Sequence, residues 1–144
     1  MPEVRPYGTW PSPITPSLLT EAAVGLSQVQ VFGDAVWWNE SRPSEGGRQA
    51  LVRDGEDVLP PPWSVRTAVH EYGGRCWTVH GDTVVFSNWA DQRLWAFTGS
   101  GHPRPLTPEP PVARAWRYAD PVVTPDGQWV VCVRERHEEA TVIN

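Results

Sequence analysis

The stretch VRTAVHEYGG, residues 65–74, places a histidine and a glutamate side by side just ahead of an apolar run. A histidine beside a carboxylate is a pairing that general acid-base catalysis uses. Neighbouring residues in a strand point to opposite sides, however, so His70 and Glu71 would face apart in an extended segment. We therefore interpret His70, Glu71 and Tyr72 as structural hydrogen-bonding groups or as contacts to a substrate or another domain. The two glycines that follow would allow a tight backbone entry into the next strand.

We expect no catalytic nucleophile, metal or cofactor in this chain. The pattern G-x-S-x-G, which places a nucleophilic serine on a strand-to-helix turn, does not occur, and the nearest stretch, GLSQV from Gly25, ends in valine. Both cysteines, Cys76 and Cys132, stand alone in strand-like runs and are interpreted as buried thiols. The residues that could offer metal ligands lack the spacing of a zinc site; they are His70, Cys76, His80, Cys132 and His137.

Arginine side chains are better candidates for binding, because a guanidinium can hold a carboxylate through two parallel hydrogen bonds. The carboxylate of a peptide or of an acidic partner loop would be the ligand. Solvated or structural ion pairs are at least as common an explanation for such residues. The candidates are Arg42, Arg48, Arg93, Arg117 and Arg134.

Composition favours a globular chain that neither binds nucleic acid nor spans a membrane. The 144 residues carry a net charge of −5 without a basic block, and 40% of them are hydrophobic. No apolar run reaches the length of a membrane span, and the N-terminus lacks the basic and apolar regions of a signal peptide. We therefore expect a cytoplasmic protein. The 16 prolines, roughly twice the usual share, disfavour long helices.

Three stretches repeat a tight turn followed by an apolar run: GDAVWWNE, GDTVVFSN and DGQWVVCV. Aligned on Ala35, Thr83 and Gln128, they are offset by 48 and 45 residues. One β-propeller blade, a meander of four strands, takes about 40 to 50 residues. The runs are almost continuously apolar, which suits strands covered on both faces. A small β-sandwich also has short strands and frequent turns, and it stays open as an alternative.

We predict an all-β fold, a partial β-propeller of about two and a half four-stranded blades. The blades lie near residues 29–64, 65–115 and 116–144, and the third ends within its third strand. Residues 1–28 form an N-terminal segment with one short helix in TPSLLTEAAV, residues 15–24, where a threonine can cap and a proline fits the first helical position. Tryptophans are expected mainly to pack between blades.

The predicted loops divide into two classes. Loops that enter a first strand, or join a second strand to a third, lie at one end of a meander; these are long and polar, as in HEYGG, RYADP, NESRPSEGGR, NWADQR and RERHEE. Turns at the opposite end are short, as in FGD, HGD and PDG. Binding residues concentrate on long loops of a rigid scaffold. We therefore predict a substrate or interdomain face that carries His70, Glu71, Tyr72, Arg42, Arg48, Asn88, Asp91, Arg93, Arg117 and Arg134.

Several stretches, in order, resemble the N-terminal β-propeller of bacterial serine peptidases of the prolyl oligopeptidase family. They are SRPSEGGRQALVR, VRTAVHEYGG, VVFSNWADQRLW, PRPLTP and RYADPVVTPDGQWVVCVRERH. The resemblance is to the branch with dipeptidyl and acylaminoacyl peptidases, and it covers nearly the whole chain. It implies a seven-bladed propeller that caps a C-terminal α/β-hydrolase domain, and that domain holds a Ser-Asp-His triad. This chain would then be an N-terminal fragment with about the first third of the ring.

The resemblance implies that the chain acts next to a catalytic domain. The propeller portion would gate or position short peptides for its partner, the α/β-hydrolase domain of a parent serine exopeptidase or oligopeptidase. Without the triad the chain alone should be inactive. Neither nucleic acid nor membrane is expected as a partner. Two other interpretations stay open: a stand-alone propeller-like interaction module, and a β-sandwich interaction domain.

Overall fold

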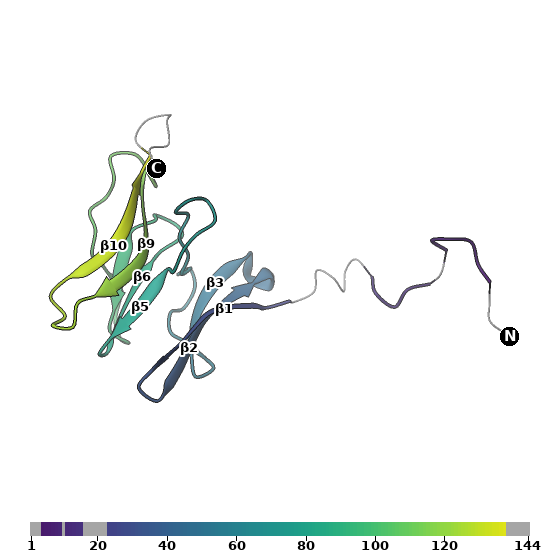
Figure 1. Ribbon diagram of the computed structural model, residues 1–144, viewed down its shortest axis with the longest axis horizontal. Coiled ribbons are helices and arrows are strands. Elements are labelled where there is room, and N and C mark those ends of the chain that lie inside the picture. Colours follow the sequence, from purple (N-terminus) through teal and green to yellow (C-terminus); the bar gives the residue numbers. More distant parts are fainter. Residues whose placement is uncertain (1–3, 10, 16–22, 138–144) are drawn as a thin grey trace.

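Three antiparallel sheets follow one another along the chain in the computed structural model (Figure 1), which describes residues 4–9, 11–15 and 23–137. The first sheet holds β1 (Gly25–Phe32), β2 (Ala35–Arg42), β3 (Arg48–Arg53) and β4 (Glu56–Asp57), with the 3₁₀ helix η1 (Pro43–Glu45) between β2 and β3. The second holds β5 (Trp77–His80), β6 (Thr83–Ser87), β7 (Leu94–Phe97) and β8 (Arg104–Pro105). The third pairs β9 (Trp116–Val123) with β10 (Val130–Arg136).

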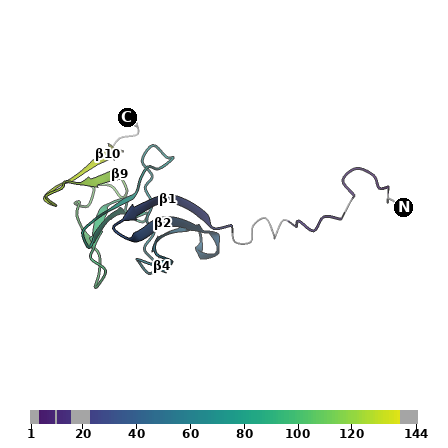
Figure 2. The same cartoon turned by 60° about the horizontal axis from the view of Figure 1, so that its bottom comes forward.

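The arrangement of these sheets confirms the prediction of an all-β partial propeller. Each four-stranded sheet is a meander in which the strands pair in chain order. Figures 1 and 2 show the three sheets side by side in the same order, and β9 packs against β5 and β6. Neighbouring blades of a propeller pack in this way, each sheet covering the face of the next.

The predicted tight turns join the first two strands of each sheet. Gly33 and Gly81 open the turns of the first two sheets with φ of 60° and 56°. In the third sheet Gly127 has a φ of 71°. Glycine adopts this left-handed backbone without strain, and such turns match the twist of the strands they join.

The main core lies between the first and second sheets and is rich in aromatic residues. Trp77 and Phe86 are paired across β5 and β6 and are almost completely buried. The Trp77 ring packs at 6.2 Å from that of Trp37, and Trp63 meets Phe86 edge to face at 5.7 Å. Packing therefore explains these tryptophans, as predicted, whereas Trp129 is 71% exposed and departs from the expectation.

A smaller cluster joins the second sheet to the third. Val85 and Leu94 pack with Tyr118, and the half-buried Cys132 borders them. The Ser87 hydroxyl donates a hydrogen bond to the Tyr118 carbonyl at 2.7 Å. The third sheet is thus fixed to the second by apolar contacts and by a buried polar bond.

Apolar side chains are exposed on the two outer faces of the three-sheet arc. On the first sheet the paired residues Val31 and Val36 point away from the second sheet and are 66% and 40% exposed. On the third sheet Val131 and Val133 are 63% and 44% exposed. A blade packed on either face would bury these side chains, as neighbouring blades do in a propeller.

Parts of three predicted loops are strands. Residues 39–42 belong to β2, 117–121 to β9 and 134–136 to β10. Backbone pairing continues past the apolar runs because ladder hydrogen bonds do not require apolar side chains. A residue of left-handed φ, Asp120 at 51°, and a register shift between Val131 and Val133 accommodate the extra length as a bulge.

Two predictions fall largely outside the described residues. The short helix expected over 15–24 lies mostly in residues 16–22, and the beginning of a third strand in the last unit falls in residues 138–144.

Of the two cysteines, Cys76 is buried as predicted, whereas Cys132 is only half-buried because it lies at the edge of the smaller cluster. Across the described ranges no helix has the length and apolar character needed to cross a membrane.

Replacing Phe86 with alanine should destabilise the fold strongly. Phe86 is completely buried between Trp63 and Trp77, and removing a buried aromatic ring costs about 3–5 kcal/mol. Urea unfolding followed by circular dichroism measures the change. Val112→Ala, at a position that is 58% exposed, is the control and should change the free energy of unfolding by less than about 0.5 kcal/mol. A similar loss in both variants would contradict the described core.

Candidate substrate face

A strained turn, residues 67–74, forms the centre of the predicted face. Its backbone is closed by hydrogen bonds from the Glu71 amide to the Ala68 carbonyl at 3.0 Å and from the Gly73 amide to the Val69 carbonyl at 2.9 Å. His70 and Glu71 have φ of 52° and 60°, in the left-handed region. His70 and Glu71 thus lie in a loop, as predicted for HEYGG, and the argument that they face apart as neighbours in a strand does not apply to them. Non-glycine residues in this region persist only where the surroundings hold them.

The glycines after the turn make the tight entry into β5 that the sequence predicted. Gly73 has a φ of 84°, and a Cβ there would lie 3.3 Å from the Thr67 carbonyl oxygen. A Cβ on Gly74 would lie 3.1 Å from Asp120 Oδ2 and 3.2 Å from the Cβ of Ala119. The close approach of β9 therefore leaves no room for a side chain at Gly74.

A buried carboxylate from the third sheet holds the turn. Glu135, on β10, is only 6% exposed, and its Oε1 accepts a hydrogen bond from the His70 amide at 2.7 Å. His70 Nδ1 lies 3.0 Å from the same oxygen, and His137 Nε2 lies 3.0 Å from Oε2. Burial raises the pKa of the Glu135 carboxyl, but bonds from His137 and from the His70 amide outweigh it, so this pKa lies below its usual range.

Three further side chains hold the segment, and they come from all three sheets. The Ala68 amide donates to Gln92 Oε1 at 2.7 Å, and the Ala68 carbonyl accepts from Arg117 Nη1 at 3.0 Å. Gln92 is completely buried. From the first sheet, Gln28 Nε2 donates to the Gly74 carbonyl at 3.4 Å. The turn is therefore fixed at its base and on both sides.

The tip of the turn points into solvent. Tyr72 is 98% exposed, and Glu71 is exposed beside it. His70 keeps 59% of its side chain exposed although its ring reaches Glu135. A large aromatic side chain thus stands free on a backbone that the rest of the fold fixes in place.

Arg42 and Arg48 belong to an ion-pair network within the first sheet. Arg42 reaches Asp57 at 2.6 Å and Glu40 at 2.7 Å, and Arg48 reaches Asp57 at 2.8 Å. Glu45 pairs with both arginines. The bond to Asp57 raises the pKa of Arg42, and the bond from Arg42 lowers the pKa of Asp57. These two guanidinium groups tie β2, η1, β3 and β4 together. Structural ion pairing, and not ligand binding, therefore explains Arg42 and Arg48.

Asn88, Asp91 and Arg93 organise the loop from β6 to β7. Asp91 Oδ1 accepts from Asn88 Nδ2 at 3.1 Å and from the Arg93 amide at 3.2 Å, and its Oδ2 accepts from Trp95 Nε1 at 3.0 Å. Arg93 Nε donates to the Thr107 carbonyl at 2.9 Å. With 12% of its side chain exposed, Arg93 anchors the segment after β8 to β7.

The structure brings His70 and Arg117 together through the 67–74 turn but not the remaining arginines. Arg117 keeps a buried Nε without a hydrogen-bond partner in the described structure. Arg134 is exposed and lies over the Trp116 ring at 5.5 Å. Arg42, Arg48 and Arg93 are bound within their own sheets, so the turn and the exposed Arg134 are the parts of the predicted face that remain available for contact.

Sequence reasoning missed Glu135 and considered His137 only as a possible metal ligand; both residues complete the cluster around His70. A signal was present in the alternation of β10, where the exposed Arg134 and Arg136 flank the buried Glu135. Residues two apart in a strand share a face. Applied to the charged end of this strand, that rule would have placed Glu135 and His137 on the inner face together.

The described residues offer little for nucleophilic or metal chemistry. Within them no group of three or more His, Cys, Asp or Glu side chains is placed to hold a metal ion. Burial raises the pKa of the Cys76 thiol to about 11, and its sulfur is held by Gln28, Asn39 and the Val65 carbonyl. A thiol with so high a pKa is a poor nucleophile at neutral pH.

Solved structures similar to this chain are peptidases. A puromycin-hydrolysing peptidase from Mycobacterium tuberculosis is 45% identical, with a TM-score of 0.85 over 97% of this chain and 23% of that chain. A puromycin hydrolase is 42% identical, with a TM-score of 0.79 over 92% of this chain and 22% of that chain. This chain thus spans less than a quarter of either. A scan against family models and a search of curated proteins gave no match.

Glu135→Gln should reduce stability at neutral pH and weaken its dependence on pH. The lowered pKa of Glu135 means that its contribution is complete above the unfolded-state value, about 4.3, and is lost as the pH falls through the lower folded-state value. We expect a loss of about 1–3 kcal/mol at pH 7 and a smaller difference from wild type near pH 3. Urea midpoints between pH 7 and pH 3 measure both effects.

The control for that experiment is Glu109→Gln, because the Glu109 side chain is 86% exposed. This variant should follow the wild-type pH profile. If Glu135→Gln also follows it at all pH values, Glu135 does not hold the turn through its charge.

Proposed function

We propose that this chain is part of the N-terminal β-propeller of a serine peptidase of the prolyl oligopeptidase family, and that it positions short substrates for a separate catalytic domain. The proposed domain is an α/β-hydrolase elsewhere in the full enzyme. The relatives support this, because they are peptidases of which this chain matches less than a quarter. The chain itself has no G-x-S-x-G sequence to supply a nucleophile.

We divide the chain into an N-terminal segment, 1–28, and three blades near 29–64, 65–115 and 116–144. In this division the 67–74 turn enters the second blade, and His70 is bound to Glu135 of the third. The turn would then stand beside the propeller axis, because first strands of blades lie innermost. A substrate entering along the axis, or the catalytic domain above it, would meet this turn.

One observation carries the proposal: Tyr72 is 98% exposed on a turn that side chains from three sheets hold in place. Strained backbone at His70 and Glu71 costs about 1–3 kcal/mol per residue, and exposing a tyrosine gives the isolated fold nothing in return. Rigid, exposed aromatic residues are efficient contact groups because little conformational entropy is lost on binding. We therefore place Tyr72 and Glu71 against the substrate or the catalytic domain.

The family branch expected from the sequence contains dipeptidyl and acylaminoacyl peptidases, which suggests the end of a short peptide as the group that reaches the turn. The relatives are described as puromycin-hydrolysing. Puromycin and short peptides are therefore the substrates to compare. Arg117, which donates to the Ala68 carbonyl from the third sheet, would supply positive charge for an acidic group.

Tyr72→Ala, made in the full-length peptidase that contains this chain, should raise KM about tenfold for puromycin or for short peptides. A contact residue outside the catalytic groups changes binding of the ground state, so kcat should change less than about threefold. Tyr72→Phe keeps the aromatic ring, so its KM should lie between those of wild type and Tyr72→Ala. Steady-state kinetics with both substrate classes provides the measurement.

Trp129→Ala is the matched control, because Trp129 is an exposed aromatic residue in the short turn between β9 and β10, at the opposite end of the third sheet. It should leave both kinetic constants unchanged. If Tyr72→Ala also leaves KM and kcat unchanged for every substrate, the turn has no part in substrate positioning, and the stand-alone interaction module becomes the better interpretation.

A further inference from the structure

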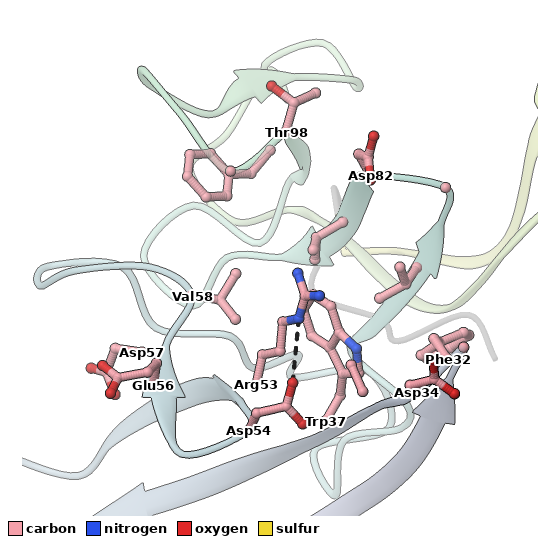
Figure 3. Close-up of a pocket in the computed structure, with 17 residues that line it drawn as sticks. Phe32, Asp34, Trp37, Arg53, Asp54, Glu56, Asp57, Val58, Asp82 and Thr98 are labelled. Atoms are coloured by element: carbon pink, nitrogen blue, oxygen red, sulfur yellow. Dashed lines mark ion pairs between the residues drawn. The ribbon is translucent and has the colours of Figure 1, made fainter.

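A second site lies between the first and second sheets, at the end formed by the short turns. The cavity has a volume of about 990 Å³ and is bordered by the turns β1–β2, β3–β4, β5–β6 and β7–β8. These turns are opposite the 67–74 turn in the meander topology, so the site is independent of the proposed function. Figure 3 shows its lining residues.

The cavity combines an apolar floor with an acidic rim. The apolar lining residues are Phe32, Ala35, Trp37, Val58, Val79, Val84 and Phe97. The rim carries Asp34, Asp54, Glu56, Asp57 and Asp82, against a single positive side chain, Arg53. Asp57 is neutralised by the arginines of the first sheet. Asp34, Glu56 and Asp82 have no ion pair with any described residue, and they leave a net negative rim above an apolar surface.

The protein already places one cation in this cavity. The Arg53 guanidinium lies 5.2 Å from the centre of the Trp37 ring, with its Nε 3.6 Å from Asp54 Oδ2 (Figure 3). Arg53 is 58% exposed and ends at an open surface, so it can leave without disturbing the core. A delocalised cation over an aromatic face and beside a carboxylate is a favourable arrangement. The cavity is therefore shaped for a flat or compact organic cation.

The Trp37 indole carries a buried donor that the described protein groups leave unpaired, as does the Trp77 indole next to it. Trp37 is 6% exposed, and its Nε1–H has no acceptor in the described structure. Figure 3 shows the ring at the centre of the lining residues. A buried donor without a partner is uncommon and requires an explanation. The face of an aromatic ring accepts a hydrogen bond from such an N–H group.

From these features we infer that this cavity binds a small aromatic amine in its protonated form. The ammonium group would be attracted by the carboxylates of Asp34 and Asp82 at the rim, while the aromatic body would displace Arg53 and pack on Trp37 and the apolar floor. An anion of the same shape would be repelled by the rim. A neutral analogue would lose the attraction of the carboxylates.

The test is a titration of the ¹⁵N-labelled chain with phenethylamine, followed through the Trp37 indole N–H resonance. The neutral analogue 2-phenylethanol has the same aromatic body and serves as the ligand control. Phenethylamine should shift the resonance saturably, with an affinity at least about tenfold higher than that of 2-phenylethanol. Its affinity should fall as the salt concentration rises.

Variants at the rim test the assignment of charge. Asp34→Asn and Asp82→Asn should each weaken phenethylamine binding about threefold, and together about tenfold. Both lie in exposed turns where asparagine is well tolerated, so the fold should be retained. Arg53→Gln should bind several-fold more tightly, because the competing internal cation is removed. Glu109→Gln changes the net charge equally, away from the cavity, and should bind as wild type does.

The inference is overturned if phenethylamine gives no saturable shift at Trp37, if 2-phenylethanol binds equally well, or if the Asp34→Asn/Asp82→Asn double variant keeps wild-type affinity. Circular dichroism melting curves of each variant confirm that an altered affinity does not come from unfolding. Because the site is remote from the 67–74 turn, the kinetic experiment on Tyr72 can fail while this binding is observed, and the reverse also holds.

Discussion

The position of the 67–74 turn depends on the burial of one carboxylate. Removing a charged group from water is costly unless hydrogen bonds and opposite charges replace the solvent. Glu135 is 6% exposed, and its replacements for water are the His70 amide, the His70 ring and the His137 ring. Two of these three groups belong to the turn. The third sheet therefore cannot keep this carboxylate buried unless the turn is in place, and the turn gains its strained conformation from the same contacts.

The first sheet uses charge differently. Arg42 and Arg48 share Asp57 and Glu45 near the ends of its strands, where part of each carboxylate is still exposed. Ion pairs at such positions contribute little individually, but a shared network fixes the short β4 against β3. Charge inside the first sheet therefore serves its own strands, whereas Glu135 joins two separate parts of the chain. This difference explains why Arg42 and Arg48 are not available for contact, whereas the His70 region is.

Local rules predicted much of the fold. The repeated turn signals located the hairpins at Gly33, Gly81 and Gly127, and the period of the apolar runs located the sheets. What these rules missed depends on contacts distant in sequence. His70 and Glu71 take left-handed backbone because Glu135, 64 or more positions away, holds the turn. The sequence indicates a loop at HEYGG, but no local signal specifies two successive left-handed residues within it.

The location of the candidate face could be predicted, but only some of the residues that form it. Long loops at one end of a meander did contain the exposed Tyr72, because topology alone decides which loops lie together. Side-chain partners were not predictable, since the sequence does not distinguish an arginine that is free in a loop from one that is bound by two carboxylates. Arg42 and Arg93 are fixed by Asp57 and by the Thr107 carbonyl, groups that strand pairing brings near. The fixed 67–74 turn at one end of the sheets and the open acidic turns at the other both follow from the meander topology. Strand pairing fixes the scaffold, and loop length decides where the chain can contact a ligand.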